Sequence, residues 1–168
     1  MFAFAICIRQ GFRLREPAAT QFYQEEVIMI QQTSIYITET DHERLGNLIK
    51  LVRDQNDRPH FAYADKLEEE LEFAEVVPPE KIPPDIVTMR SKVKLEDLDT
   101  GEESSYTIVF PTEANFDEGK ISILAPIATA LLGNKLGSTV EFEAPSRRRR
   151  VKIESILYQP EAVGNYDQ

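Results

Sequence analysis

The sequence predicts an α+β fold, in which a short antiparallel helical hairpin precedes an antiparallel-sheet domain with one short helix. Apolar residues first recur with helical spacing, a proline-rich stretch then interrupts them, and later segments alternate between apolar and polar residues as strands do. The expected parts, in chain order, are an extension at 1–33, the hairpin at 34–77, a linker at 78–85, the sheet domain at 86–160 and a tail at 161–168.

Two amphipathic segments joined by a polar turn predict the helical hairpin. Thr40 and Glu43 form a capping box at the start of the first segment. The apolar positions that follow have spacing i, i+3, i+4 and i+7: Leu45, Leu48, Ile49 and Val52. The expected buried face of the second segment consists of Tyr63, Leu67, Leu71 and Ala74. Because each apolar stripe is narrow, we expect a short coiled coil with Asp54, Asp57 and Arg58 at its tip.

The C-terminal domain is predicted from strand-like runs that follow the prolines. The four prolines between Val77 and Asp85 cannot continue a helix and favour an extended linker. Pro126 suits the first position of a short apolar helix, and Gly133 suits the left-handed residue that ends it. A helix with so little polar surface is expected to pack on the sheet. The strand-like runs are 87–89, 93–95, 106–110, 121–124, 139–143 and 151–158.

Composition narrows the class of protein. The chain has 19 basic and 29 acidic residues, a net charge of −10 that disfavours strong binding to duplex DNA. A single cysteine, Cys7, excludes an internal disulfide and fits a reducing cytoplasm. The apolar run 1–8 is short and precedes its basic residues, so it does not predict a secretory signal or membrane anchor. Met29 is an alternative first residue, which would make 1–28 dispensable.

Catalytic motifs are scarce, so the sequence predicts no enzyme, no cofactor and no metal. His42 and His60 are the only histidines, and the common phosphate, dinucleotide and zinc motifs are missing from the sequence. The acidic run Glu68, Glu69, Glu70 and Glu72 is interpreted as an exposed helix face, with a weak divalent-ion surface as the alternative.

The basic run Arg147, Arg148, Arg149 and Arg150 is expected in a hairpin loop. It could contact nucleic acid or an acidic protein surface. The alternative is a turn whose charge is balanced by nearby acids, namely Glu141, Glu143 and Glu154.

Several stretches resemble a known family. The helix start Ala125-Pro126-Ile127-Ala128 and the helix end Ala130-Leu131-Leu132-Gly133 resemble the C-terminal domain of the Gre-type transcription factors of bacteria. Three other stretches are similar to the branch of regulators of nucleoside diphosphate kinase: 84–91, 98–102 and 158–162. The resemblance covers roughly 34–166 and implies an FKBP-like C-terminal domain.

The resemblance also implies a partner and a site. Gre factors dock at the rim of the secondary channel of RNA polymerase, and the residues at the corresponding positions here are Leu124, Ala125, Pro126, Ile127 and Thr129. Leu124, Ala125 and Thr129 replace polar or basic residues of the Gre pattern, and the alternative is that Pro126 and Ile127 only start and pack a helix. Gre factors also bring two carboxylates to the polymerase metal site, where they activate water. The first predicted helix, 40–53, spans only roughly 20 Å, about half of what that task needs. We therefore assign Asp54 and Asp57 to turn chemistry.

The expected function is that of a non-enzymatic, monomeric and cytoplasmic regulator that binds RNA polymerase and competes with Gre cleavage factors. One alternative is a true transcript-cleavage cofactor, and another is a general protein-interaction module. A prolyl isomerase is disfavoured, because it needs a deep aromatic pocket and the domain has few aromatic residues: Tyr106, Phe110, Phe116, Phe142 and Tyr158.

Overall fold

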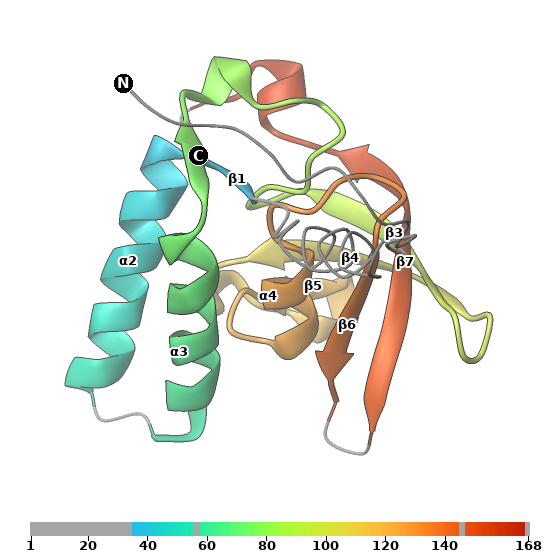
Figure 1. The fold of residues 1–168 in the computed structure, drawn as a ribbon, viewed down its shortest axis with the longest axis horizontal. Coiled ribbons are helices and arrows are strands. Elements are labelled where there is room, and N and C mark those ends of the chain that lie inside the picture. The colour runs from blue at the N-terminus through green and yellow to red at the C-terminus, as the bar shows by residue number, and fades with distance from the viewer. Residues whose placement is uncertain (1–34, 56–57, 145–146, 167–168) are drawn as a thin grey trace, which may run out of the picture. The chain divides into compact units, whose positions relative to one another are not determined.

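The computed structural model describes residues 35–55, 58–144 and 147–166, and it confirms the α+β class (Figure 1). Helices α2 (Glu39–Asp54) and α3 (Arg58–Glu72) come first and pack against each other. A five-stranded sheet follows, with the order β5-β4-β3-β7-β6. Its strands are β3 (Lys92–Asp97), β4 (Glu103–Val109), β5 (Lys120–Ser122), β6 (Thr139–Glu143) and β7 (Arg148–Tyr158). The extension at 1–33, with Cys7 and Met29, lies outside the described residues.

The start of α2 lies two residues earlier than the capping box predicted. Thr38 is the N-cap, and its Oγ1 accepts a hydrogen bond of 3.0 Å from the backbone N–H of Asp41. The predicted positions Leu45, Ile49 and Val52 are buried on α2. On α3 the buried stripe contains Ala64, Leu67 and Leu71. Tyr63 is 38% exposed, because a shift of one residue turns a side chain by about 100° around a helix.

Two short strands join the ends of this helix pair. Strand β1 (Tyr36–Thr38) precedes α2, strand β2 (Glu75–Val77) follows α3, and the two are parallel. The proline-rich stretch beyond β2 was predicted to be extended, but it contains a 3-10 turn, η1 (Pro79–Lys81). Ile82 and Ile86 are buried, so this stretch packs against the rest of the fold.

The sheet departs from the predicted all-antiparallel arrangement at one edge. Strand β5 runs parallel to β4, with Thr107 opposite Lys120. The connection between them contains two 3-10 turns, η2 (Pro111–Glu113) and η3 (Phe116–Glu118). Through these turns the chain runs back towards the start of β4, so that β5 can pair with β4 in the same direction. Residues 87–89 were expected to be a strand. They form an irregular segment instead, because the backbone turns sharply between Thr88 and Ser91.

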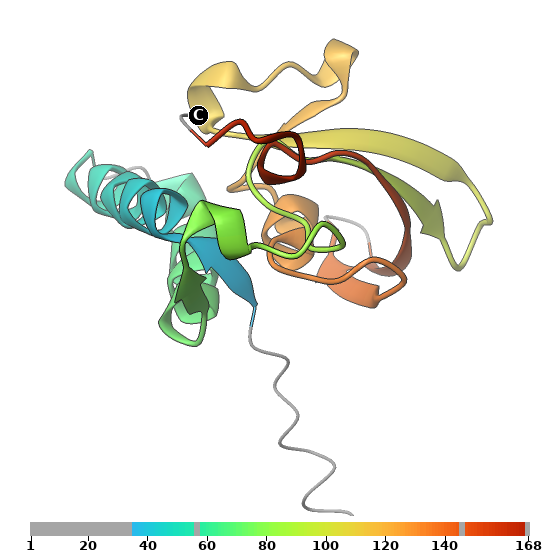
Figure 2. The same cartoon turned by 90° about the horizontal axis from the view of Figure 1, so that it is seen from above.

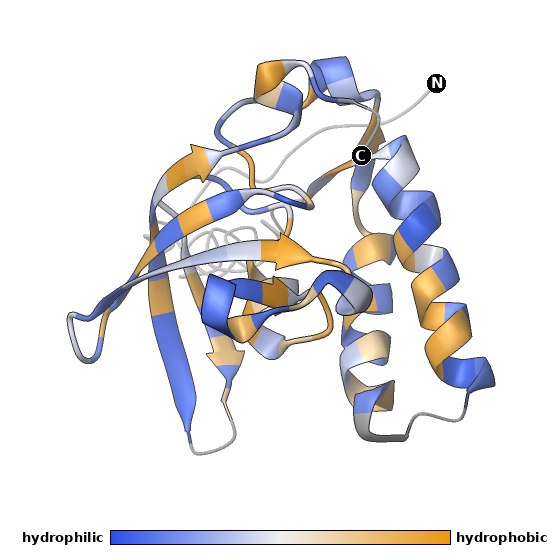
Figure 3. Ribbon diagram, turned by 180° about the vertical axis from the view of Figure 1, so that it is seen from behind, coloured by the Kyte–Doolittle hydropathy of each residue, from blue (hydrophilic) through white to orange (hydrophobic). Residues whose placement is uncertain are grey.

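Helix α4 (Pro126–Leu131) begins at the predicted proline and lies between α3 and β6 (Figure 1 and Figure 2). It contributes Ala128, Leu131 and Leu132 to a core that also contains residues of α2, α3 and the sheet. Figure 3 shows the strands alternating between hydrophobic and hydrophilic residues, as expected when one sheet face covers this core. The helix pair and the sheet therefore share one hydrophobic core.

Candidate functional site

The start of α4 is the surface that the sequence assigned to polymerase contact. Ala125 is the N-cap, with extended backbone angles, and Pro126 occupies the first helical position. Ala125, Pro126 and Ile127 are half-buried, so part of each side chain faces solvent. These three residues form a small apolar surface, which we call the α4 surface.

Two of the predicted contact residues point inward. Leu124 is buried at 6% exposure, and Thr129 is buried at 2%. The hydroxyl of Thr129 donates a hydrogen bond of 2.7 Å to the carbonyl of Ile123 and so fixes α4 to the end of β5. Neither side chain is available to a partner, and the accessible part of the predicted site is the α4 surface.

The tip of the helix pair carries few described acidic groups. Asp54 is the last residue of α2 and is exposed, Asp57 lies outside the described residues, and Arg58 begins α3. Just before the tip, Arg53 bridges the two helices through ion pairs with Asp65 at 2.9 Å and Glu68 at 2.6 Å. In the described segments, no group of three or more His, Cys, Asp or Glu residues could hold a metal ion.

The arginine run lies mostly in β7 rather than in the loop. Arg149 donates through Nε to Asp97 at 2.8 Å, and a second guanidinium nitrogen contacts the same oxygen. Arg150 donates to Asp99 at 3.1 Å. Arg148 lies 3.8 and 3.6 Å from the carboxylates of Glu141 and Glu143. Only Arg147, in the bend before β7, has no ion-pair partner among the described residues.

Asp97 is the centre of this arrangement. Its carboxylate also accepts hydrogen bonds from the backbone N–H groups of Asp99 and Thr100, at 2.8 and 3.0 Å. The hydrogen bond from Arg149, followed by that from Asp99, lowers the pKa of Asp97 to about 2. Arg149 therefore orders the turn between β3 and β4, which favours the structural interpretation of the arginine run over nucleic-acid contact.

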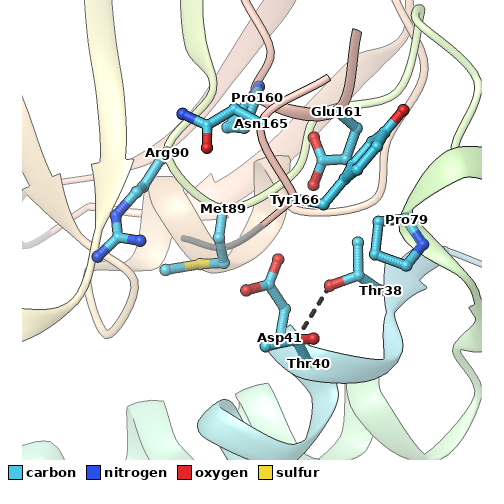
Figure 4. A pocket seen from close by; sticks show the side chains of 10 residues that line it. All are labelled: Thr38, Thr40, Asp41, Pro79, Met89, Arg90, Pro160, Glu161, Asn165 and Tyr166. Atoms are coloured by element: carbon cyan, nitrogen blue, oxygen red, sulfur yellow. Dashed lines mark hydrogen bonds between the residues drawn. The ribbon is translucent and has the colours of Figure 1, made fainter. Parts of the chain in front are cut away.

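A small polar pocket at the N-terminal end of α2 was not predicted (Figure 4). Asp41 from α2 and Glu161 from the C-terminal turn η4 (Glu161–Val163) both line it. Its volume of about 20 Å³ has room for about one water molecule. Asp41 is 6% exposed, and burial together with the charge of Glu161 raises its pKa to about 6. Burial also raises the pKa of Glu161.

A tight turn from Thr88 to Ser91 forms another wall of this pocket. Thr88 donates through its hydroxyl to Glu161 at 2.7 Å, so residues 161–166 are not simply a free tail. Arg90 has φ of +59°, a left-handed conformation that is uncommon for a residue with a Cβ atom. Its guanidinium pairs with Glu113 at 2.9 Å and lies 6.0 Å from the ring centroid of Phe110.

The pocket lies where three segments meet: the start of α2, the turn before β3 and the C-terminal segment. The hydrogen bond from Thr88 to Glu161 joins the last two of these segments, and the pocket is too small for a substrate. Two stretches that contributed to the family resemblance, 84–91 and 158–162, supply residues of this pocket, but neither suggested a role for it. Within the described part of the chain, no helix is long and apolar enough to cross a bilayer.

Two family models match different parts of the chain. Residues 82–158 match the model for the C-terminal part of the transcription elongation factors GreA and GreB. Residues 33–77 match the model for the Rnk N-terminus. A solved structure, the prokaryotic transcription elongation factor GreA/GreB from Nitrosomonas europaea, is 40% identical with a TM-score of 0.62. That similarity covers 74% of this chain and 98% of the other.

The fold and these matches define a transcription-elongation-related factor. A regulator of nucleoside diphosphate kinase from Escherichia coli (strain K12) is 33% identical over 141 residues, which is 82% of this chain and 98% of that protein. The factor GreA from Thermodesulfovibrio yellowstonii is 37% identical over 94 residues, 56% of this chain and 60% of that protein. The chain belongs to the family of regulators of nucleoside diphosphate kinase.

Proposed function

We propose that this protein binds RNA polymerase at the rim of the secondary channel and modulates transcription elongation without cleaving RNA. The α4 surface would make the contact, and the helix pair would occupy the channel entrance. The observation that carries the proposal is the half-exposed apolar start of α4 within the segment that matches the GreA and GreB C-terminal part. An effect on nucleoside diphosphate kinase, to which the name of the Escherichia coli relative refers, would then be indirect.

The length of the helix pair supports a role without cleavage. Helix α2 has 16 residues, which corresponds to a length of about 24 Å at a rise of 1.5 Å per residue. Arg53 ties the helices together near the tip through Asp65 and Glu68, so these two carboxylates are engaged within the protein. A helix pair of this length would block the entrance and leave the polymerase metal site out of reach. Competition with Gre factors for the entrance follows from this arrangement.

Pro126→Asp is expected to weaken binding to core RNA polymerase by at least about tenfold, because it places a charge in a small apolar contact. Aspartate is well tolerated at the first position of a helix, where it interacts favourably with the helix dipole, so α4 is expected to remain folded. Binding would be measured with purified protein on immobilised core enzyme.

The matched control is Leu98→Asp, which changes an apolar side chain that is 40% exposed at the turn between β3 and β4. It should bind polymerase as the unaltered protein does. Equal binding by Pro126→Asp and the unaltered protein would remove the α4 surface from the proposal. No binding by the unaltered protein would remove the proposal as a whole.

A second candidate function is transcript cleavage, and the exposed Asp54 at the end of α2 is the observation that favours it. It would require this carboxylate to reach the polymerase metal ion. A prolyl isomerase is not favoured, since Phe142 lies in the core while Phe116 is 78% exposed, so these aromatic residues do not line a common pocket.

A further inference from the structure

The helix pair has a groove to which the proposed function assigns no contact residue. A groove of about 370 Å³ lies between α2 and α3 and shares no lining residue with the α4 surface. Gly46 and Ile49 from α2 and Leu71 from α3 line its base. We call it the α2–α3 groove.

Gly46 is the first indication that this groove accepts a partner. Glycine inside a helix destabilises it relative to alanine, so an interior glycine usually has a packing reason. Here a Cβ atom at Gly46 would meet nothing within 4 Å, so the chain's own packing gives no such reason. A glycine at this position keeps the groove open and permits close approach of another backbone.

The charges at the groove indicate the chemistry of the partner. Glu69 and Glu72 of α3 line one side, are exposed, and have no ion-pair partner among the described residues. Glu68 on the same side is already engaged by Arg53 at 2.6 Å. Lys50 lies on the opposite side. Two carboxylates beside an apolar base complement a segment with apolar residues flanked by cations.

We propose that the α2–α3 groove binds an amphipathic helix of another protein, whose apolar stripe is flanked by lysine or arginine. Apolar side chains of that helix would cover Gly46 and Ile49, and its cations would pair with Glu69 and Glu72. This is the helix-in-groove mode of recognition. A second copy of this chain fits less well, because its own helix pair carries more acidic than basic residues and would oppose like charges.

The test measures binding of labelled synthetic helices by fluorescence anisotropy at physiological salt. One probe has a leucine stripe with lysine flanks, and the other has the same stripe with glutamate flanks. The lysine probe should bind the unaltered protein at least about tenfold more tightly than the glutamate probe. Gly46→Leu, which fills the groove, should weaken the lysine probe by at least about tenfold.

Gly46→Leu could weaken binding by disturbing α2, so variants that change only surface charge provide a second test. The double variant Glu69→Lys with Glu72→Lys should also weaken the lysine probe at least about tenfold. The control is Glu43→Lys with Glu80→Lys, which makes the same change of net charge at two exposed residues outside the groove. The control should change the affinity less than about twofold.

Three outcomes would overturn the proposal. The lysine probe does not bind the unaltered protein, or the control pair weakens it as much as the groove pair, which would indicate general charge attraction. In the third outcome the unaltered protein self-associates and Gly46→Leu makes it monomeric, which would make a second copy the occupant.

Discussion

Gly133→Ala is expected to destabilise the protein by about 3 kcal/mol, the sum of a left-handed backbone conformation and an overpacked contact. Gly133 has φ of +71°, which disfavours any residue with a Cβ atom. An added Cβ would also lie 2.2 Å from the Cβ of Ile35 and 3.0 Å from its Cα. A rotamer change cannot relieve a clash with these atoms, so the backbone before α2 would have to move away from the end of α4.

Equilibrium unfolding in urea would measure this loss, and Gly137→Ala provides the matched control. Gly137 also has a positive φ, +86°, but a Cβ there would meet nothing within 4 Å. The control should therefore lose only the conformational part, about 1 kcal/mol. If both variants lose the same free energy, the contact between Gly133 and Ile35 does not connect α4 to the segment before α2.

Asp41→Asn is expected to stabilise the protein at pH 8 by up to about 3 kcal/mol and to have little effect near pH 4. Burial, then the charge of Glu161, raises the pKa of Asp41 from 3.8 to about 6, while Thr38, Arg44 and Arg90 act in the opposite direction. Between pH 3.8 and about 6, the carboxyl group of Asp41 is therefore protonated in the folded state and ionised in the unfolded state. The stability from this proton is complete below about pH 4 and is lost as the pH rises through 6.

Urea unfolding at several pH values would check the effect of Asp41→Asn. Asp97→Asn is the control, because its effect on stability should depend on pH in the opposite direction: Arg149 lowers the pKa of Asp97 to about 2. Its carboxylate contributes stability above about pH 4 that is lost as the pH falls towards 2. Asp97→Asn should therefore destabilise at pH 7, with a smaller loss in acid. A pH-independent effect of Asp41→Asn would mean that the pocket at the start of α2 does not bury a titrating carboxyl group.

The sequence predicted those boundaries that are set by residues close together in the chain. Pro126 gave the start of α4, and the alternation at 139–143 gave the full extent of β6. Other boundaries depended on tertiary contacts. Thr38 and Thr40 are both suitable caps, and the structure uses Thr38, which is also the last residue of β1 to pair with β2. On α3, packing against α2 selected the stripe through Ala64 over the one through Tyr63.

The candidate sites were harder to predict, because their partners are far apart in the chain. Arg149 and Asp97 are separated by 52 residues, so a basic run that resembled a binding loop is used within the sheet. Thr88 and Glu161 are separated by 73 residues, and no periodic pattern indicates that they meet. Thr129 occupies a predicted contact position, but its hydroxyl binds Ile123 inside the fold.

Cleavage of RNA in backtracked elongation complexes tests the central proposal most directly. A fixed amount of a Gre cleavage factor is added with Mg²⁺, this protein is titrated in, and the shortened transcript is measured. We expect this protein alone to produce no cleavage above that of polymerase, and to reduce Gre-stimulated cleavage progressively as its concentration rises. Cleavage by this protein alone would make it a cleavage cofactor, and unchanged Gre-stimulated cleavage at saturation would contradict binding at the channel entrance.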